Sequence, residues 1–401
     1  MYAVFAYAKA RLIRLFVVKL ILPAVYNASV LRKNLVIFAV VAVISAGLII
    51  YLAKKPPENR ITNIPQFKSD NQPQETSKEA ISVYAQNLEV VWAMAFLPNG
   101  DLLATERKGT VNLIDKEGNV SRIFTLGNVL QTGESGLHGI AIHPDFENNQ
   151  FVYLYNTYRG NGDNTQNRVS RFTFDGKTFT QEKIIVDAIP GAIFHDGGRI
   201  KFGPDKNLYI TTGDARNPSL AQDVNSLAGK ILRVTDEGDP APGNPFGTRI
   251  YSYGHRNPQG IAWDDKGRLW ETEHGDSATD EFNLITIGKN YGWPTIRGEQ
   301  KAEGMQSPIL HSGQETWAPA GAAFINGSVF FGGLRGQALF QAKLQDNSAV
   351  LSVHFKEQFG RIRDVIVGPD GFLYISTSNQ DGREKPASGD DKIIRINPDQ
   401  F

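Results

Sequence analysis

The sequence of 401 residues contains no cysteine. This absence excludes disulfide bonds, thiolate metal sites, cysteine nucleophiles and the acylated cysteine of a lipoprotein. An excess of charge of one sign is also missing, because 42 lysine and arginine residues balance 42 aspartate and glutamate residues. No basic stripe runs through the C-terminal bulk of the chain, so nucleic acid is not an expected partner.

Long uncharged hydrophobic runs are rare, and residues 35–53 form the clearest one. Its nineteen residues are about what the core of a bilayer requires. The preceding residues 1–34 carry six basic and no acidic side chains, which favours their retention as a cytoplasmic or interfacial segment. We therefore predict one transmembrane helix over 35–53, a polar linker over 54–81 and an extracytoplasmic domain over 82–401. A cleaved signal peptide is the alternative, but the basic region and the apolar run are long for one.

The remaining chain repeats one phrase: an apolar strand, a turn of Pro, Asp and Gly, and a second strand rich in aromatic and β-branched residues. Its copies are WAMAFLPNGDLLATE (92–106), IAIHPDFENNQFVYLYNT (140–157), IKFGPDKNLYITTGD (200–214), IAWDDKGRLWETEHG (261–275), DVIVGPDGFLYISTS (364–378) and the weaker AAFINGSVFFGGL (322–334).

Hairpins that recur at this spacing, with short strands between them, are typical of a β-propeller. One four-stranded blade cannot bury both of its faces, so neighbouring blades must stack around an axis. The six copies predict an all-β, six-bladed propeller over 82–401. A pair of β-sandwiches would not explain so regular a repeat.

Two loops before the third and fourth hairpins are richer in functional residue types than turns require. In Phe194-His195-Asp196-Gly197-Gly198-Arg199, glycines leave the His195 imidazole room to face a cavity, although a lone loop histidine is more often structural. In Tyr253-Gly254-His255-Arg256-Asn257-Pro258, Arg256 offers a planar fork for carboxylate or quinone oxygens, and Asn257 offers a neutral donor and acceptor. His138 and His143 are expected to be structural.

Two further loops carry concentrated charge. The run Glu273-His274-Gly275-Asp276-Ser277-Ala278-Thr279-Asp280-Glu281 combines carboxylates with turn carbonyls, an environment that suits calcium, although a solvated acidic loop is an equal alternative. Arg361 and Arg363 are two residues apart, so on a strand they point to the same face and together favour an anion with several oxygens. The alternative is that one arginine pairs with Asp364 and the other is solvated.

The runs GGRIKFGPDKNLYITTGD, GKILRV, IYSYGHRNPQGIAW, EHG and DEFNLITIGKNYGWP resemble the aldose sugar dehydrogenases that depend on pyrroloquinoline quinone (PQQ). This group includes the soluble glucose dehydrogenases and the glucose/sorbosone dehydrogenase-like proteins. The resemblance covers about 85–401 and is most specific in 195–294. It implies a six-bladed propeller, which agrees with the repeat count, and PQQ and Ca²⁺ as cofactors.

The resemblance also implies residue roles. His195 matches the general base that takes the proton of the sugar C1 hydroxyl. Arg256 and Asn257 match residues that hold PQQ and polarise its reacting carbonyls, and the pair Arg361 and Arg363 matches the residues that bind the PQQ carboxylates.

Other positions match with changes. Gly275 and Asp276 match the two residues whose main-chain carbonyls bind Ca²⁺, although a proline is usual at the second. Arg335 stands where the family has a PQQ-contacting lysine, and Glu134 stands where a glutamine is expected on the PQQ edge. An acidic Glu134 would weaken affinity for an anionic cofactor. Phe194 replaces a frequent aspartate before the base.

The sequence therefore predicts a membrane-anchored quinoprotein that oxidises the C1 position of aldose sugars to lactones and passes electrons to an external acceptor. A non-catalytic propeller of the same lineage, which binds a sugar or a protein, is the alternative.

Overall fold

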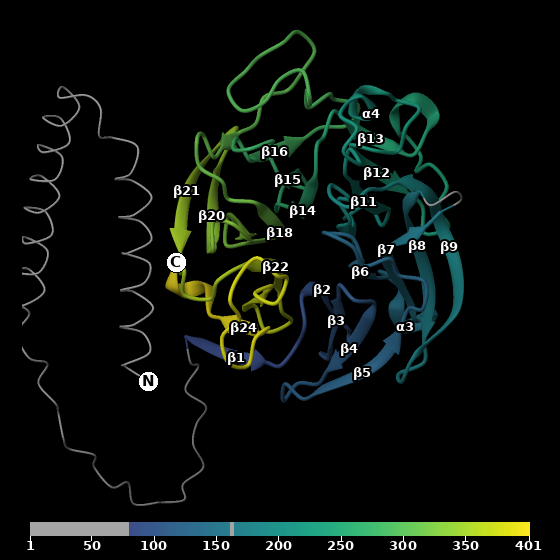
Figure 1. The fold of residues 1–401 in the computed structure, drawn as a ribbon, viewed down its shortest axis with the longest axis vertical. Helices are drawn as coiled ribbons and strands as arrows, with labels where there is room; N and C mark the ends of the chain where they lie inside the picture. The colour runs from purple at the N-terminus through teal and green to yellow at the C-terminus, as the bar shows by residue number, and fades with distance from the viewer. Residues whose placement is uncertain (1–79, 161–163) are drawn as a thin grey trace, which may run out of the picture. The chain divides into compact units, whose positions relative to one another are not determined.

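The computed structural model describes residues 80–160 and 164–401, which form a ring of six four-stranded antiparallel sheets (Figure 1). The predicted six-bladed all-β propeller is confirmed. The predicted transmembrane helix and basic segment, and all but the last residues of the predicted linker, lie outside the described residues. Within the two described ranges, no helix has both the length and the apolar character needed to cross a bilayer.

Each blade takes four strands, and five blades take them consecutively. In chain order these are β2 (Val91–Phe96), β3 (Leu102–Glu106), β4 (Thr110–Ile114), β5 (Val120–Thr125); β6 (Leu137–Ile142), β7 (Phe151–Arg159), β8 (Thr165–Phe174), β9 (Phe179–Pro190); β10 (Ile200–Phe202), β11 (Leu208–Thr212), β12 (Lys230–Val234), β13 (Ile250–Tyr253); β14 (Pro258–Trp263), β15 (Leu269–Glu273), β16 (Glu281–Ile285), β17 (Leu310–His311); and β18 (Pro319–Ile325), β19 (Ser328–Gly333), β20 (Ala338–Gln345), β21 (Ser348–His354). The sixth blade holds β22 (Ile362–Val367), β23 (Leu373–Thr377), β24 (Ile393–Ile396) and β1 (Ile81–Ala85). Single-turn helices are α3 (Phe146–Asn149), α4 (Ser219–Gln222), η2 (Pro245–Gly247) and η3 (Pro398–Gln400).

The ring is closed by the first described strand. β1 pairs antiparallel with β24, with Ile81 opposite Ile396 and Val83 opposite Ile394, so residues from both ends of the propeller share the sixth blade (Figure 1). A second link lies nearby, because the Asp391 carboxylate accepts a hydrogen bond of 2.8 Å from the Val90 N–H. These contacts hold blade 6 against blade 1 and complete the stacking that each blade needs to bury its faces.

Every repeated phrase forms the first two strands of a blade. The second strands β3, β11, β15 and β23 are buried along their whole length, on both faces. This burial explains why apolar and β-branched residues dominate them on both faces, with the buried Glu106, Glu271 and Glu273 as exceptions. The core lies between neighbouring blades; one cluster, for example, packs Trp92 and Val111 of blade 1 against Leu137, Leu154 and Phe172 of blade 2.

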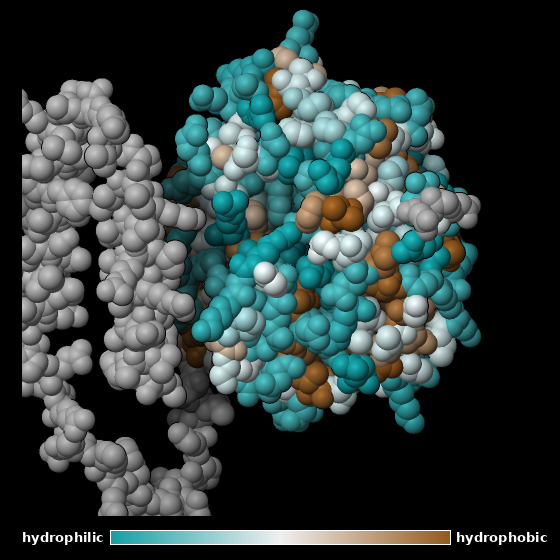
Figure 2. Space-filling model, in the orientation of Figure 1, coloured by the Kyte–Doolittle hydropathy of each residue, from teal (hydrophilic) through white to brown (hydrophobic). Residues whose placement is uncertain are grey.

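Strand direction decides which loops meet. Because neighbouring strands are antiparallel, the turn between the first and second strands of each blade lies at one end of the ring. The connections between blades, and the turns between second and third strands, lie at the other end. The repeated Pro/Asp/Gly turns occupy the first end, and the four loops singled out in the sequence occupy the second. The face seen in Figure 2 is mostly hydrophilic, with hydrophobic side chains in small separate patches.

Candidate functional site

A cavity of about 300 Å³ lies among the loops at this second end. Eight of the nine predicted site residues line it, namely Glu134, His195, Arg256, Asn257, Gly275, Asp276, Arg335 and Arg361. The ninth, Arg363, is buried beside the same loops. Residues from blades 2, 3, 4, 5 and 6, separated by more than two hundred positions in the sequence, thus converge on one site.

His195 lies in the connection between β9 and β10 and has a left-handed backbone with φ of 66°. Its Nδ1 lies 2.8 Å from Oδ1 of the buried Asp214, so Nδ1 carries the proton and donates it to the carboxylate. Asp214 is fixed in turn by the Trp293 indole, which donates to Oδ2 at 2.9 Å. The imidazole is 19 % exposed and lines the cavity, so its second nitrogen, Nε2, is available to a ligand there.

Arg256 and Asn257 lie in the connection between β13 and β14. The Asn257 Oδ1 accepts a hydrogen bond of 3.0 Å from the Gly197 N–H, which ties this loop to the loop of His195. The Arg256 guanidinium donates to the carbonyls of His274 at 3.3 Å and Asp276 at 3.4 Å. The connection between β13 and β14 therefore joins the base to the acidic loop.

Several buried nitrogens around the cavity lack a partner among the described residues. They are Asn257 Nδ2, Arg256 Nε, His274 Nε2 and Arg363 Nε. Buried polar atoms are nearly always hydrogen-bonded, and leaving one unpaired costs its full desolvation penalty. Because the unpaired atoms are all nitrogens, the cavity fits a ligand that is rich in oxygen acceptors and carries negative charge.

The acidic loop between β15 and β16 is solvated only in part, at Asp276 and Ser277. The Asp280 carboxylate is buried and accepts hydrogen bonds from the backbone N–H groups of Gly275, Trp317 and Ala318, at 2.8, 2.6 and 2.9 Å. The Asp276 carboxylate is 48 % exposed and pairs with Arg297 at 2.8 Å. The side chain of Asp276 is therefore engaged with Arg297, whereas its main-chain carbonyl faces the Arg256 guanidinium.

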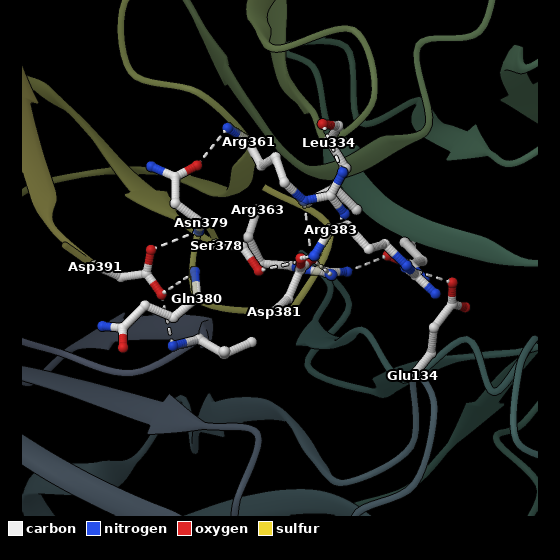
Figure 3. Close-up of polar contacts among 12 residues, drawn as sticks. Glu134, Leu334, Arg361, Arg363, Ser378, Asn379, Gln380, Asp381, Arg383 and Asp391 are labelled. Atoms are coloured by element: carbon white, nitrogen blue, oxygen red, sulfur yellow. Dashed lines mark hydrogen bonds and ion pairs between the residues drawn. The ribbon is translucent and has the colours of Figure 1, made fainter. Parts of the chain in front are cut away.

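Arg361 and Arg363 share one carboxylate, that of Asp381 (Figure 3). Arg361 donates to Asp381 Oδ2 from Nε at 2.9 Å and from Nη2 at 2.7 Å, and to the Leu334 carbonyl at 3.0 Å. Arg363 Nη2 lies 4.0 Å from the same oxygen, and burial lowers the pKa of Arg363 to about 9. The alternative pairing with Asp364 is not seen, because Asp364 pairs with Arg199 at 3.0 Å.

Four functional candidates were missed by the sequence reasoning: Asp214, His274, Asp381 and Arg383. His274 belongs to the quoted acidic run but was given no role; it lines the cavity, and burial lowers its pKa to about 4, so it is neutral near pH 7. Asp214 ends the third hairpin phrase, where an aspartate is also an ordinary turn residue. Asp381 and Arg383 occupy a polar loop with no motif.

Two histidines of the quoted runs have structural surroundings. His138 is buried, stacks on Trp92 with ring centroids 4.7 Å apart, and contacts the Glu134 carbonyl at 3.0 Å. His255 is buried between Ser252 Oγ at 2.9 Å and Glu273 Oε2 at 2.8 Å. Both rings hold loops of the site in place without lining the cavity.

One group of side chains among the described residues has the closeness of a metal site, namely His255, Glu271 and Glu273, whose ligand atoms lie within 4.8 Å of one another. His255 and Glu273 already pair with each other. Burial, followed by the charge of Glu273, raises the pKa of Glu271 well above its ordinary value. A protonated Glu271 carries no charge, so this cluster does not need a metal ion to balance it.

Comparison with known proteins places this geometry in a family. A family model described as glucose/sorbosone dehydrogenase matches residues 88–394. The aldose sugar dehydrogenase YliI of Escherichia coli is 32 % identical over 75 % of this chain and 91 % of its own length. Quinoprotein glucose dehydrogenase B of Acinetobacter calcoaceticus is 34 % identical, over 55 % of this chain and about half (54 %) of its own length.

Among solved structures, the PQQ-bound aldose sugar dehydrogenase of Streptomyces coelicolor is 40 % identical, with a TM-score of 0.74 over 79 % of this chain and 97 % of that one. The match of the family model covers most of the propeller, and the quoted motifs lie within it. The chain belongs to the glucose/sorbosone dehydrogenase family.

Proposed function

We propose that this protein is a quinoprotein dehydrogenase that oxidises the C1 position of aldose sugars to lactones, with PQQ and Ca²⁺ as cofactors and an external electron acceptor. The observation that carries the proposal is that the free Nε2 of His195 and a set of unpaired N–H donors share one cavity. Membership of a family of sugar oxidoreductases and a PQQ-bound relative support it.

The residues around the cavity fit PQQ, whose carboxylates and quinone carbonyls are oxygen acceptors. Asn257 Nδ2 and Arg256 Nε would donate to the quinone carbonyls, and Arg361 with Arg363 would bind carboxylates. Arg335, which also lines the cavity, would add a further cation. The main-chain carbonyls of Gly275 and Asp276 would hold Ca²⁺, a hard cation that prefers oxygen ligands.

When bound, PQQ supplies a quinone carbon that accepts a hydride from C1 of the sugar. The protein's own part is proton transfer. His195 Nε2 takes the proton of the C1 hydroxyl, and the resulting positive imidazolium is stabilised by the Asp214 carboxylate on Nδ1. Asp214 also selects the tautomer that leaves Nε2 unprotonated, and Trp293 fixes the orientation of Asp214.

The test is to titrate the full-length protein with PQQ in the presence of Ca²⁺ and to follow dye reduction by a panel of aldoses. We expect PQQ to bind at micromolar concentrations and at least one aldose to be oxidised. His354→Asn, which changes a histidine on the outer strand β21, is the matched control for His195→Asn and should keep activity. Failure of the wild-type protein to bind PQQ would reject the proposal. Sugar binding without turnover would favour the non-catalytic alternative.

We also propose that residues 35–53 anchor the propeller to a membrane and leave it extracytoplasmic, with residues 1–34 inside. The support is the uncharged run and the basic residues before it. The test is fractionation of the expressing cells followed by extraction of membranes at alkaline pH. The full chain should stay with the membrane pellet and a variant lacking residues 1–53 should not. Release of both into the soluble fraction would contradict the anchor.

A further inference from the structure

Glu134 poses an electrostatic problem for the proposed function, on which this inference rests. It lies in the connection between β5 and β6, lines the cavity, and has a side chain that is 20 % exposed. A carboxylate in the wall of a cavity for an anionic cofactor repels that cofactor, and the repulsion is strong where water is partly excluded.

The other two acidic residues that line the cavity are already engaged. Asp280 accepts three backbone N–H groups, and the Asp276 carboxylate is paired with Arg297. Glu134 is therefore the carboxylate whose charge bears most directly on a ligand. Burial opposes the ionisation of Glu134, yet interactions with His274 first, and then with Arg383 and Arg363, hold its pKa below the ordinary value. Glu134 is thus negative at neutral pH.

Arg383 neutralises this charge. It lies in the loop between β23 and β24 of blade 6, lines the same cavity, and donates from Nη1 to Glu134 Oε1 at 2.9 Å (Figure 3). The two residues are 249 positions apart in sequence. The guanidinium also lies over the ring of Phe194, 5.9 Å from its centroid, at the residue that precedes His195. Arg383 of blade 6 therefore contacts both loops that flank blade 2: the loop of Glu134 before it and the loop of Phe194 after it.

The backbone of Arg383 is held by the carboxylate that holds Arg361. The Arg383 N–H donates to Asp381 Oδ1 at 3.0 Å, while Arg361 donates twice to Asp381 Oδ2 (Figure 3). One buried acid thus places both a predicted carboxylate-binding arginine and the arginine that covers Glu134. This arrangement fixes the two guanidiniums relative to each other before any ligand enters.

Stability does not explain the pair. The Arg383 side chain is 41 % exposed, and ion pairs of this exposure contribute little to folding. We propose that Arg383 is a positioning residue for the cofactor: by pairing with Glu134 it neutralises a repulsive charge of the cavity wall, so that an anionic quinone can bind despite a glutamate at this position.

The test is a double-mutant cycle on PQQ affinity, measured by equilibrium titration with Ca²⁺ present, with the full-length wild-type protein, Arg383→Gln, Glu134→Gln and the double variant. Arg383→Gln should weaken PQQ binding about tenfold or more when Glu134 is present, and less than about threefold when Glu134→Gln is also present. Glu134→Gln alone should leave affinity unchanged or tighten it. Thermal unfolding midpoints of all four proteins should agree.

Arg216→Gln is the matched control. The Arg216 guanidinium lies 5.8 Å from the centroid of the same Phe194 ring but does not contact Glu134, so its effect on PQQ affinity should be the same with and without Glu134→Gln. Equal losses from Arg383→Gln in both backgrounds, or a tenfold loss from Glu134→Gln alone, would overturn the inference while wild-type PQQ binding left the proposed function intact. Absence of PQQ binding by the wild-type protein would overturn both.

Discussion

The two sides of the cavity differ in how their polar groups are satisfied. On the side built by the loops of blades 3 and 4, Arg256, Asn257 and His274 keep buried nitrogens without a partner among the described residues. On the side built by blade 6, the fork of Arg361 is occupied by Asp381 and the Leu334 carbonyl, and Arg383 is occupied by Glu134.

This difference separates two tasks. The unpaired groups of blades 3 and 4 gain partners only when a ligand enters, so they serve binding and chemistry at some cost to the empty protein. Arg361 and Arg383 of blade 6 are paired beforehand and help to hold the loops rigid, whereas Arg363 of the same blade keeps one unpaired buried nitrogen. We therefore expect substitutions on the first side to change activity more than stability, and loss of the buried Asp381 carboxylate on the second side to do the reverse.

We expect the largest effect on activity from His195→Asn, on the first side. Loss of the base should lower turnover of the PQQ-loaded protein about 10³-fold, because a positioned general base contributes in this range. The midpoint of thermal unfolding should not change, since the imidazole is partly exposed and makes one hydrogen bond, to Asp214. Steady-state dye reduction and a melting curve check both expectations. A comparable loss of stability would mean that His195 is structural.

We expect the largest effect on stability from Asp381→Asn, on the second side. It leaves Arg361 and Arg363 buried without their shared anion, and removing one partner of a buried ion pair typically costs about 3 kcal/mol or more. Urea unfolding should show this loss in the free energy of unfolding. Asp370→Asn, at a partly exposed carboxylate in the turn between β22 and β23 that pairs with Arg395, is the control and should cost about 1 kcal/mol or less. Equal costs would remove the distinction between the two sides.

Asp214→Asn separates catalysis from cofactor binding on the first side. An asparagine keeps the shape but no longer fixes Nδ1 as the donor or stabilises the imidazolium, so turnover should fall about 10²-fold. The affinity for PQQ should stay within a few fold, because Asp214 contacts His195 and Trp293 and does not line the cavity. The ratio of the two effects is the readout. Loss of PQQ binding in parallel with turnover would show that Asp214 shapes the whole pocket.

His138→Leu tests a histidine that belongs to neither side. Burial lowers the pKa of His138 to about 3 from 6.5, so between these pH values the unfolded chain binds more protons than the folded protein. Stability must therefore fall as the pH drops below 6.5. Replacing His138 with leucine should reduce the loss between pH 7 and pH 5 by about 2 kcal/mol, as measured by urea unfolding at both pH values. An unchanged pH dependence would contradict the burial of this ring.

The sequence predicted the blades because their information is local. A turn of Pro, Asp and Gly flanked by apolar runs marks each first hairpin, and the six hairpins define six blades. Closure was not predicted, because the pairing of Ile81 with Ile396 joins residues at opposite ends of the propeller and leaves no local pattern. The strand β17 was missed for another reason, because its two residues are too few to show a strand pattern.

The candidate site shows the same limit. Motifs identified the residues that line the cavity, since GHRN and the paired arginines stand out locally. Their partners did not stand out: Asp381 and Arg383 occur in a polar loop that reads as an ordinary turn, and Glu134 meets Arg383 only across 249 positions. The sequence therefore predicted that Glu134 would weaken cofactor binding, without the neutralising effect of Arg383.

The proposed function depends on the unpaired nitrogens of blades 3 and 4, which would bind the oxygen acceptors of a cofactor beside His195. The most direct test is to grow crystals of the protein in the presence of PQQ and Ca²⁺ and to solve the structure. We expect PQQ in this cavity, with its oxygen acceptors bonded to Asn257 Nδ2 and Arg256 Nε and with His195 Nε2 open to the space beside the quinone. An empty cavity at saturating PQQ, or PQQ bound elsewhere while those nitrogens stay unpaired, would contradict it.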